Sequence, residues 1–220
     1  QHDMIFYNPY SSNRPHNEID STKQGIQFNK TDYHQSHTLT YGLQVGQQKL
    51  AGSNFDQQDN LKKVVFIHDD WQITEPLKLR LGARYDDYER YSSNFSPRLG
   101  AVYKINPKFN LHATVEEAYA APTLSDLVYS KQGNIKPESA VAYETGIRFR
   151  DRKIKGEINY FQKNVENLIS WDSEAEQTYN IDNVEVAGVE LILNKNLLTN
   201  LTANFNYTYL DARNAKTGER

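Results

Sequence analysis

The segment that decides the fold runs from Val115 to Phe149 and reads VEEAYAAPTLSDLVYSKQGNIKPESAVAYETGIRF. Two alternating stretches flank a long polar loop that extends from Ala121-Pro122 to Pro137-Glu138. Because successive side chains of a strand point to opposite faces, the second stretch predicts a strand with one apolar and one charged face. Soluble antiparallel sheets alternate in the same way, so the rest of the chain has to decide what surrounds the sheet.

Length and composition narrow the class of protein. A chain of 220 residues is long enough for one sizeable all-β unit. Its mean hydropathy is −0.78 and 24% of its residues are charged, which rules out the run of about 18 apolar residues that a helical membrane span needs. A transmembrane strand escapes that test, because only every second residue faces lipid. Fifteen tyrosines and nine phenylalanines also favour strands.

The cysteine content and the net charge narrow the possible functions further. The chain contains no cysteine, so thiolate metal sites, disulfides and cysteine nucleophiles are excluded. Its net charge is −3, which argues against a nucleic-acid partner, because such partners need a clustered basic surface. The sequence begins at Gln1 and stops at Arg220 after a strand pattern. We therefore expect an internal fragment of a longer protein.

Alternating segments continue along the chain, and no stretch has a sustained helical period. Residues 1–19 contain prolines and asparagines and are expected to form a loop. The pattern predicts an all-β fold with strands at about residues 20–30, 36–48, 61–74, 77–90, 96–105, 109–119, 138–150, 153–163, 184–195 and 200–210.

The connections between these segments alternate in length. Short ones are expected at residues 31–34, 75–76, 106–108, 151–153 and 196–199, and long ones at 49–60, 86–95, 120–137, 164–183 and beyond 211. In an up-and-down meander, this order puts all tight turns at one end and all long loops at the other. Outer-membrane barrels have this layout, with short periplasmic turns and long outer loops. The expected fold is thus an antiparallel up-and-down transmembrane β-barrel.

The two faces of the strands agree with a barrel in lipid. Charged and small polar residues of one parity would line a wet interior, and the apolar parity carries aromatic residues near both ends. Trp71, Tyr103, Phe109 and Phe149 lie towards the short turns, and Tyr85, Tyr119 and Tyr209 towards the long loops, as two interfacial girdles would. Asp69 and Gly188 interrupt the alternation, and the sequence predicts a bulge at Gly188.

Several motifs resemble TonB-dependent outer-membrane receptors. AYAAPTLSDLVYS (residues 118–130) followed by GNIKPESAVAYETGIRF (133–149) resembles the motif region of that family. FIHDDWQITEPLKLRLGARYD, YNIDNVEVAGVELILN and YTYLDARNAKTGER look like the same family, so the similarity spans most of residues 61–220. The family-motif residues are Ala121, Pro122, Asn134, Lys136, Pro137 and Glu138.

The resemblance implies a 22-stranded barrel around an N-terminal plug that engages TonB. Residues 1–220 would supply about ten of these strands, without the plug, the TonB box or the last strands. It further implies a monomer in the outer membrane of a Gram-negative-type bacterium, in contact with membrane lipid and lipopolysaccharide, with no resident cofactor and no metal site.

The implied activity is TonB-dependent uptake of a large, scarce nutrient. The YLDARN and APTLSDL elements look most similar to cobalamin (vitamin B12) receptors, and ferric siderophore receptors come next. Haem receptors of the family carry a histidine between the two motif elements, and residues 121–137 contain none. A passive porin and a soluble β-sandwich binding protein are the remaining alternatives. Aromatic and polar loop residues are the expected cargo contacts: Tyr88, Tyr91, Tyr129, Asn134, Trp171, Asp172 and Tyr179.

Catalysis is not expected. His68 and Asp70 share one face of a strand and could form a base with its orienting carboxylate, but no nucleophile completes the set. Glu116 and Glu117 point to opposite faces, so they cannot act as the paired acids of a glycosidase. Carboxylates that line a wet interior account for these residues.

Overall fold

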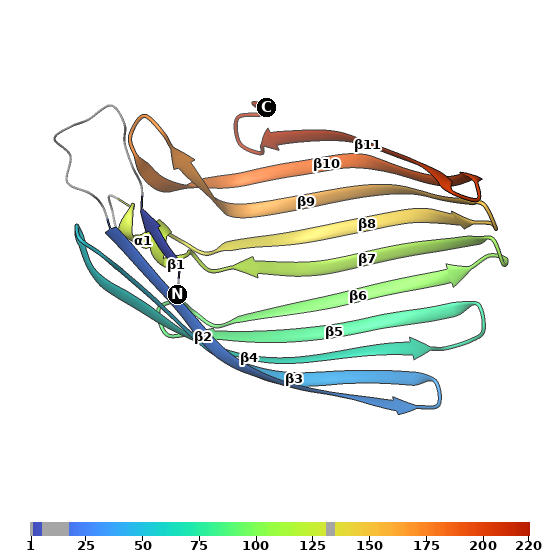
Figure 1. Ribbon diagram of the computed structural model, residues 1–220, viewed down its shortest axis with the longest axis horizontal. Coiled ribbons are helices and arrows are strands. Elements are labelled where there is room, and N and C mark those ends of the chain that lie inside the picture. Colours follow the sequence, from blue (N-terminus) through green and yellow to red (C-terminus); the bar gives the residue numbers. More distant parts are fainter. Residues whose placement is uncertain (1, 6–17, 131–134) are drawn as a thin grey trace.

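The computed structural model describes residues 2–5, 18–130 and 135–220. Eleven strands and one short helix form in these ranges (Figure 1). They are β1 (His2–Ile5), β2 (Glu18–His34), β3 (His37–Gly52), β4 (Phe55–Gln72), β5 (Leu77–Tyr88), β6 (Asn94–Lys104), β7 (Phe109–Ala120), α1 (Leu124–Val128), β8 (Glu138–Arg150), β9 (Ile154–Asp172), β10 (Gln177–Leu198) and β11 (Leu201–Asn214).

Each strand pairs antiparallel with its neighbours in the sequence, so the sheet order is β1 to β11 without a crossover. The connections from β2 to β3, β4 to β5, β6 to β7, β8 to β9 and β10 to β11 are tight turns at one end of the sheet (Figure 1). We call this the turn end, and the opposite end the loop end. The expected all-β, antiparallel, up-and-down architecture is confirmed.

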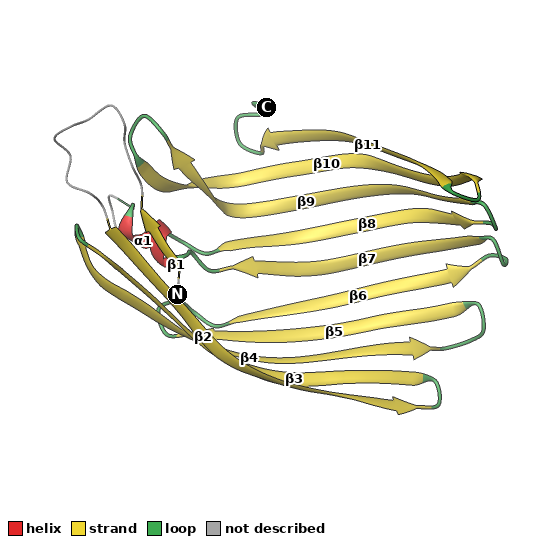
Figure 2. Ribbon diagram, viewed as in Figure 1, coloured by secondary structure: helices red, strands yellow, loops and turns green. Residues whose placement is uncertain are grey.

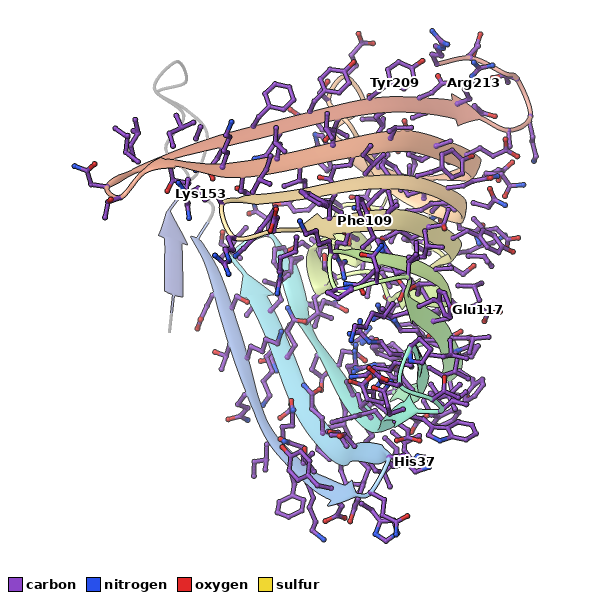
Figure 3. The ribbon with its side chains drawn as sticks, turned by 90° about the vertical axis from the view of Figure 1, so that its right-hand side faces the viewer. His37, Phe109, Glu117, Lys153, Tyr209 and Arg213 are labelled. Atoms are coloured by element: carbon purple, nitrogen blue, oxygen red, sulfur yellow. The ribbon has the colours of Figure 1, made fainter. Side chains whose placement is uncertain are left out.

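The sheet curves into an open trough, which Figure 3 shows from the side, with β11 above and β2 and β3 below. Large apolar side chains stand exposed on one face, among them Val65, Leu99, Ile158 and Phe205. The other face carries cross-strand ion pairs such as Arg98–Glu116, with Nε and Oε2 3.2 Å apart. This is the expected division into a lipid-facing surface and a wet interior, which we call the lumen.

The prediction of several long loops was wrong. Residues 49–60 and 164–183 are mostly strand, because β3 and β4 continue to a turn at residues 53–54, and β9 and β10 to a turn at 173–176. Above a bilayer both faces of a strand meet water, so the apolar alternation stops while the backbone pairing continues. Among the loops of the described part, only the connection between β7 and β8, with described residues 121–130 and 135–137, is long.

Smaller differences concern the ends of elements. The predicted turn at residues 31–34 is strand, and the chain turns at residues 35–36; the predicted turn at 196–199 lies at 199–200. Residues 2–5 were expected in a loop and form β1, whereas residues 6–17 are outside the described ranges. The helix α1, red in Figure 2, was not expected, because five residues are too few to show a helical period.

The register explains both interruptions of the alternation. Pairing of β4 with β3 and β5 is continuous across Asp69, so its carboxylate stays on the lipid-facing side, where Oδ2 lies 2.7 Å from His37 Nδ1. The His37 ring stacks on Trp71 at the turn end. The bulge predicted at Gly188 is wrong, because β10 pairs without a break with β9 and β11 there. Val184 and Val186 instead face the lumen.

Gly188 is required because the Phe161 ring covers it from the neighbouring strand. A Cβ at residue 188 would lie 2.5 Å from Phe161 Cζ and 2.4 Å from the Tyr209 carbonyl oxygen. We expect Gly188→Ala to lower the free energy of unfolding by about 1–3 kcal/mol, the cost of overpacking. Gly156→Ala is the matched control, because its Cβ would meet no atom closer than 3.5 Å. Urea unfolding in lipid vesicles measures both, and equal losses would contradict the explanation.

Candidate ligand-binding surface at the loop end

The connection between β7 and β8 is the element that organises the loop end. It begins at the Ala121-Pro122 motif, where Pro122 is buried, and it enters α1 through a capping box. Thr123 Oγ1 accepts a hydrogen bond from the Asp126 backbone N–H at 3.2 Å, and the Thr123 N–H donates to Asp126 Oδ2 at 2.8 Å. Such a pair satisfies otherwise free backbone donors at the start of a helix. The polar residues of the APTLSD element therefore fix where α1 starts.

Helix α1 packs against β3 and β4, which are far from it in the sheet order. Leu124 is 2% exposed, and Leu50 of β3 and Val64 of β4, which both face the lumen, are 5% and 2% exposed. These three side chains are most of the buried apolar core in the described part of the chain. The connection therefore folds inward across the mouth of the trough instead of extending into solvent.

The other half of the connection is attached to the hairpin of β9 and β10. The Thr178 N–H donates to the Tyr129 carbonyl oxygen at 3.1 Å, and the rings of Tyr129 and Trp171 meet edge to face with centroids 5.6 Å apart. Residues 121–130 thus touch β3 and β4 on one side and β9 and β10 on the other. One connection holds two distant hairpins in a fixed relation.

The second family motif provides two more attachments. The Asn180 amide donates to the Lys136 carbonyl oxygen at 3.0 Å, and its Oδ1 accepts from the Lys136 N–H at 2.8 Å. Glu138 Oε1 accepts from the Ile169 N–H at 2.6 Å. Pro137 lies between these two anchors, and Asn134 is outside the described residues. Lys136 and Glu138 therefore hold the connection in place in this structure.

Asn180 is the residue on which this attachment depends most, since its amide also donates to the Asn167 carbonyl oxygen at 2.7 Å. We expect Asn180→Ala to destabilise the docked connection by about 1–3 kcal/mol, because three hydrogen bonds to backbone groups are lost at about 0.5–1.5 kcal/mol each. Amide hydrogen exchange at Lys136 should then accelerate about 10-fold or more. Asn183→Ala, three residues along β10, is the control. Unchanged exchange in Asn180→Ala would refute the role of this side chain.

A second aromatic cluster lies where β5 and β6 connect. The Tyr88 ring is 6.3 Å from that of Tyr91 and 5.8 Å from that of Tyr119, measured between centroids. Tyr119 was expected in the outer girdle, and its hydroxyl also donates to the Ser92 carbonyl oxygen at 3.3 Å. Lys62 Nζ stands 4.7 Å from the centre of the Tyr88 ring, close enough for a cation–π contact.

The carboxylate of Asp86 lies beneath this cluster and is 4% exposed. Arg84 donates two hydrogen bonds to it at 2.7 and 2.9 Å, and Lys62 Nζ lies 2.9 Å from Oδ1. Two cations thus share one buried carboxylate, and one of them, Lys62, also lies over the Tyr88 ring. The sequence does not single out Asp86, because charged residues occur along the whole lumen face.

Tyr91 is a predicted contact residue of this cluster that is partly buried. Burial raises the pKa of the Tyr91 hydroxyl to about 12, and the neighbouring Asp126 carboxylate of α1 adds to the shift. Its hydroxyl oxygen is buried and has no hydrogen-bond partner within the described residues. Tyr91 is therefore a neutral group that packs between the β5–β6 connection and α1.

The predicted contact residues divide into exposed and structural side chains. Tyr129, Trp171 and Tyr179 are 38%, 50% and 39% exposed, so their rings are open to a ligand. Asp172 Oδ1 instead accepts hydrogen bonds from the backbone N–H groups of Glu174 and Ala175, at 2.9 and 3.0 Å, and forms the turn of the β9–β10 hairpin. The exposed rings define the candidate surface.

The side chains considered for catalysis lie in the lumen wall. His68 Nε2 is 3.2 Å from Asp70 Oδ1, and Arg80 Nε shares the same oxygen at 3.5 Å. Glu116 pairs with Arg98. Within the described ranges, His, Asp and Glu form no group of three or more that could hold a metal ion. Those ranges also contain no candidate transmembrane helix.

The fold and this surface define a class of protein, an outer-membrane β-barrel. The family model for the TonB-dependent receptor-like β-barrel matches residues 3–220. The chain therefore belongs to the TonB-dependent receptors of the Gram-negative outer membrane, as part of their barrel.

Relatives within the family have different names. The chain is 24% identical to the vitamin B12 transporter BtuB of Photobacterium profundum, over 91% of this chain and 36% of that protein. It is 26% identical to the probable TonB-dependent siderophore receptor PirA of Acinetobacter baumannii, over 58% of this chain and 20% of that protein. The chain therefore spans about a third or less of the length of these curated relatives.

Solved structures have the same fold at lower identity. The siderophore receptor PirA from Pseudomonas aeruginosa superimposes with a TM-score of 0.76 and 22% identity, over 90% of this chain and 41% of that one. The copper transporter OprC superimposes with a TM-score of 0.79 and 15% identity, over 92% of this chain and 38% of that one.

Proposed function

We propose that residues 1–220 form one part of the wall of a TonB-dependent active transporter, whose plug and remaining strands lie in other parts of the protein. The transporter captures a large, scarce nutrient at the loop end and releases it towards the periplasm when TonB, the energy-coupling partner, acts on the plug. Cobalamin is the favoured cargo and a ferric siderophore the second candidate. Haem is a weaker candidate, and a passive porin is the remaining alternative. The protein makes and breaks no bond in its cargo and works as a monomer.

One observation supports capture at the loop end more than any other. Three exposed rings, those of Tyr129, Trp171 and Tyr179, stand on backbone that is fixed by the connection between β7 and β8. Aromatic rings give a large contact area and lose little conformational freedom when they bind a ligand. A rigid support lowers the entropic cost of binding further. Exposed rings of this kind suit a large ring-containing molecule better than a small ion.

The choice between the two cargoes rests on similarity. The relatives include proteins named as vitamin B12 transporters and proteins named as siderophore receptors, at comparable identity. The YLDARN and APTLSDL elements favour cobalamin. The lining itself is neutral between them, since both cargoes are large and carry ring systems.

Equilibrium binding to the full-length receptor tests the proposal. Cyanocobalamin and a panel of ferric siderophores are titrated in parallel, and nanomolar binding of one of them corresponds to about −12 kcal/mol. Binding of a siderophore alone would keep the receptor and replace the favoured cargo. If neither class binds, capture of such nutrients is wrong.

Two variants locate the binding surface. Trp171→Ala is expected to weaken binding about 10-fold or more, as truncation of an aromatic anchor does. Tyr33→Ala is the matched control, because this tyrosine is 82% exposed but lies at the turn end. Uptake by cells with and without TonB separates the active transporter from a passive porin, which would admit its solute in both.

A further inference from the structure

A shallow groove of about 560 Å³ crosses the lipid-facing side of the sheet from β5 to β9. Its floor is a row of small side chains, Ala101, Ala113 and Thr145, which are opposite one another in register. Leu99, Val115 and Tyr143 form its wall towards the loop end. Its volume lies within the roughly 300–1,000 Å³ that is usual for ligand pockets.

The groove is continuous with the surface that the bilayer covers. A bulky row borders the floor on the turn-end side as well, where Tyr103, Leu111 and Ile147 are opposite one another. Tyr103 and Leu111 are 47% and 44% exposed, and Tyr143 is 50% exposed, so lipid reaches both borders. The groove between the two bulky rows is wide enough for one extended hydrocarbon chain. Lipid acyl chains are the apolar groups that surround the protein at this depth of a membrane.

The depth of the groove selects one leaflet. Ala113 lies four residues beyond the start of β7 at Phe109. At about 3.3 Å per residue and a tilt of about 40°, the floor is only about 10 Å above the turn end. The apolar band of such barrels is about 25 Å tall and their short turns are periplasmic. The groove is therefore in the half of the band that the periplasmic leaflet fills.

The turns at the ends of β6, β7, β8 and β9 provide a matching charge. Lys108 lies in the turn between β6 and β7, and Arg152 and Lys153 lie in the turn between β8 and β9; Lys153 is labelled in Figure 3. The only carboxylate in these two turns, that of Asp151, lies 3.1 Å from Lys108 Nζ. A net positive charge remains at the height where lipid phosphates lie, and such residues attract anionic lipids.

We propose that this face binds one phospholipid of the periplasmic leaflet, with an acyl chain in the groove and the phosphate near Arg152 and Lys153. The bound lipid fills the groove between the two bulky rows, so that the barrel presents an even apolar surface to the membrane. An anionic headgroup such as that of phosphatidylglycerol is preferred. This site is separate from the cargo surface, since it lies near the other end of the strands.

Native mass spectrometry of the full-length receptor with palmitoyl-oleoyl phosphatidylglycerol tests the proposal. Ala113→Leu fills the floor and is expected to lower the occupancy of the retained lipid at least 10-fold. Ala83→Leu is the matched control, because Ala83 is on the same face of β5 but outside the groove. Equal lipid occupancy in wild type and Ala113→Leu would show that the groove does not hold the lipid. A loss in Ala83→Leu as large as that in Ala113→Leu would show the same. Heat-modifiable electrophoretic mobility checks that each variant is folded.

A second arm tests the leaflet and the headgroup. Arg152→Gln with Lys153→Gln is expected to lower phosphatidylglycerol occupancy about fivefold for each charge removed. Lys49→Gln, at the loop end of β3, should leave it unchanged. Displacement of the bound lipid by equimolar lipopolysaccharide would overturn the assignment to the periplasmic leaflet. Occupancy that is insensitive to both turn substitutions would overturn the role of the charges.

Discussion

Leu124→Asp is expected to release α1 from the wall of β3 and β4. Leu124 is 2% exposed, and truncating a buried leucine alone costs about 2–5 kcal/mol. A carboxylate at this position costs more, because burial of a charge is strongly unfavourable. The docked state of residues 121–130 should therefore no longer be populated, while the rest of the sheet keeps its pairing.

Hydrogen exchange measures this release directly. The Leu127, Tyr129 and Ser130 amides donate to backbone carbonyls within the docked segment. Their protection should disappear in Leu124→Asp, and cargo affinity should fall with it, because Tyr129 and Trp171 lose their common support. Ser125→Asp is the matched control, as it puts the same charge on the exposed side of the same helix. Retained protection in Leu124→Asp would show that α1 is held by its other contacts.

The sequence predicts the barrel wall well, and the reason is physical. Lipid on one side and water on the other force a period of two, so strands such as β5 and β7 are recognised almost to the residue. Tight turns at residues 75–76, 106–108 and 151–153 follow from asparagine, proline and aspartate at their centres. The part of the chain that protrudes from the bilayer has no such constraint. β9 and β10 therefore extend well beyond the pattern that predicts them.

The site is predicted less completely than the wall. Exposed aromatic residues such as Trp171 and Tyr129 can be identified by residue type, but their supports cannot. Asn180 holds Lys136 across 44 positions of sequence, and no local pattern connects the two. Asp172 is predicted as a ligand contact because a carboxylate can orient a ligand, and the hydrogen bonds by which it also shapes a turn could not be predicted. Contacts between distant segments become visible only when the register of the sheet is known.

Asp86→Ala is the second substitution with a large expected effect. It leaves the Lys62 and Arg84 cations without the carboxylate that they share. Removing one partner of a buried ion pair costs about 3–5 kcal/mol, and partial exposure of both cations lowers our expectation to about 2–4 kcal/mol. Urea unfolding in lipid vesicles measures the loss. Asp87→Ala is the matched control: its carboxylate is half exposed and 4.0 Å from Lys63, so the expected cost is about 0–1 kcal/mol.

A double-mutant cycle separates the ion pairs from the packing of Asp86. If the attraction to Lys62 dominates, Lys62→Met should cost little once Asp86 has been replaced, and the coupling energy should exceed about 1 kcal/mol. Additive losses would mean that Asp86 acts through Arg84 alone. Because Lys62 also lies over the Tyr88 ring, Asp86→Ala frees that cation and the ring together. A fall in cargo affinity in Asp86→Ala but not in Asp87→Ala would therefore connect the Tyr88 cluster to capture, since neither carboxylate is an exposed contact of the candidate surface.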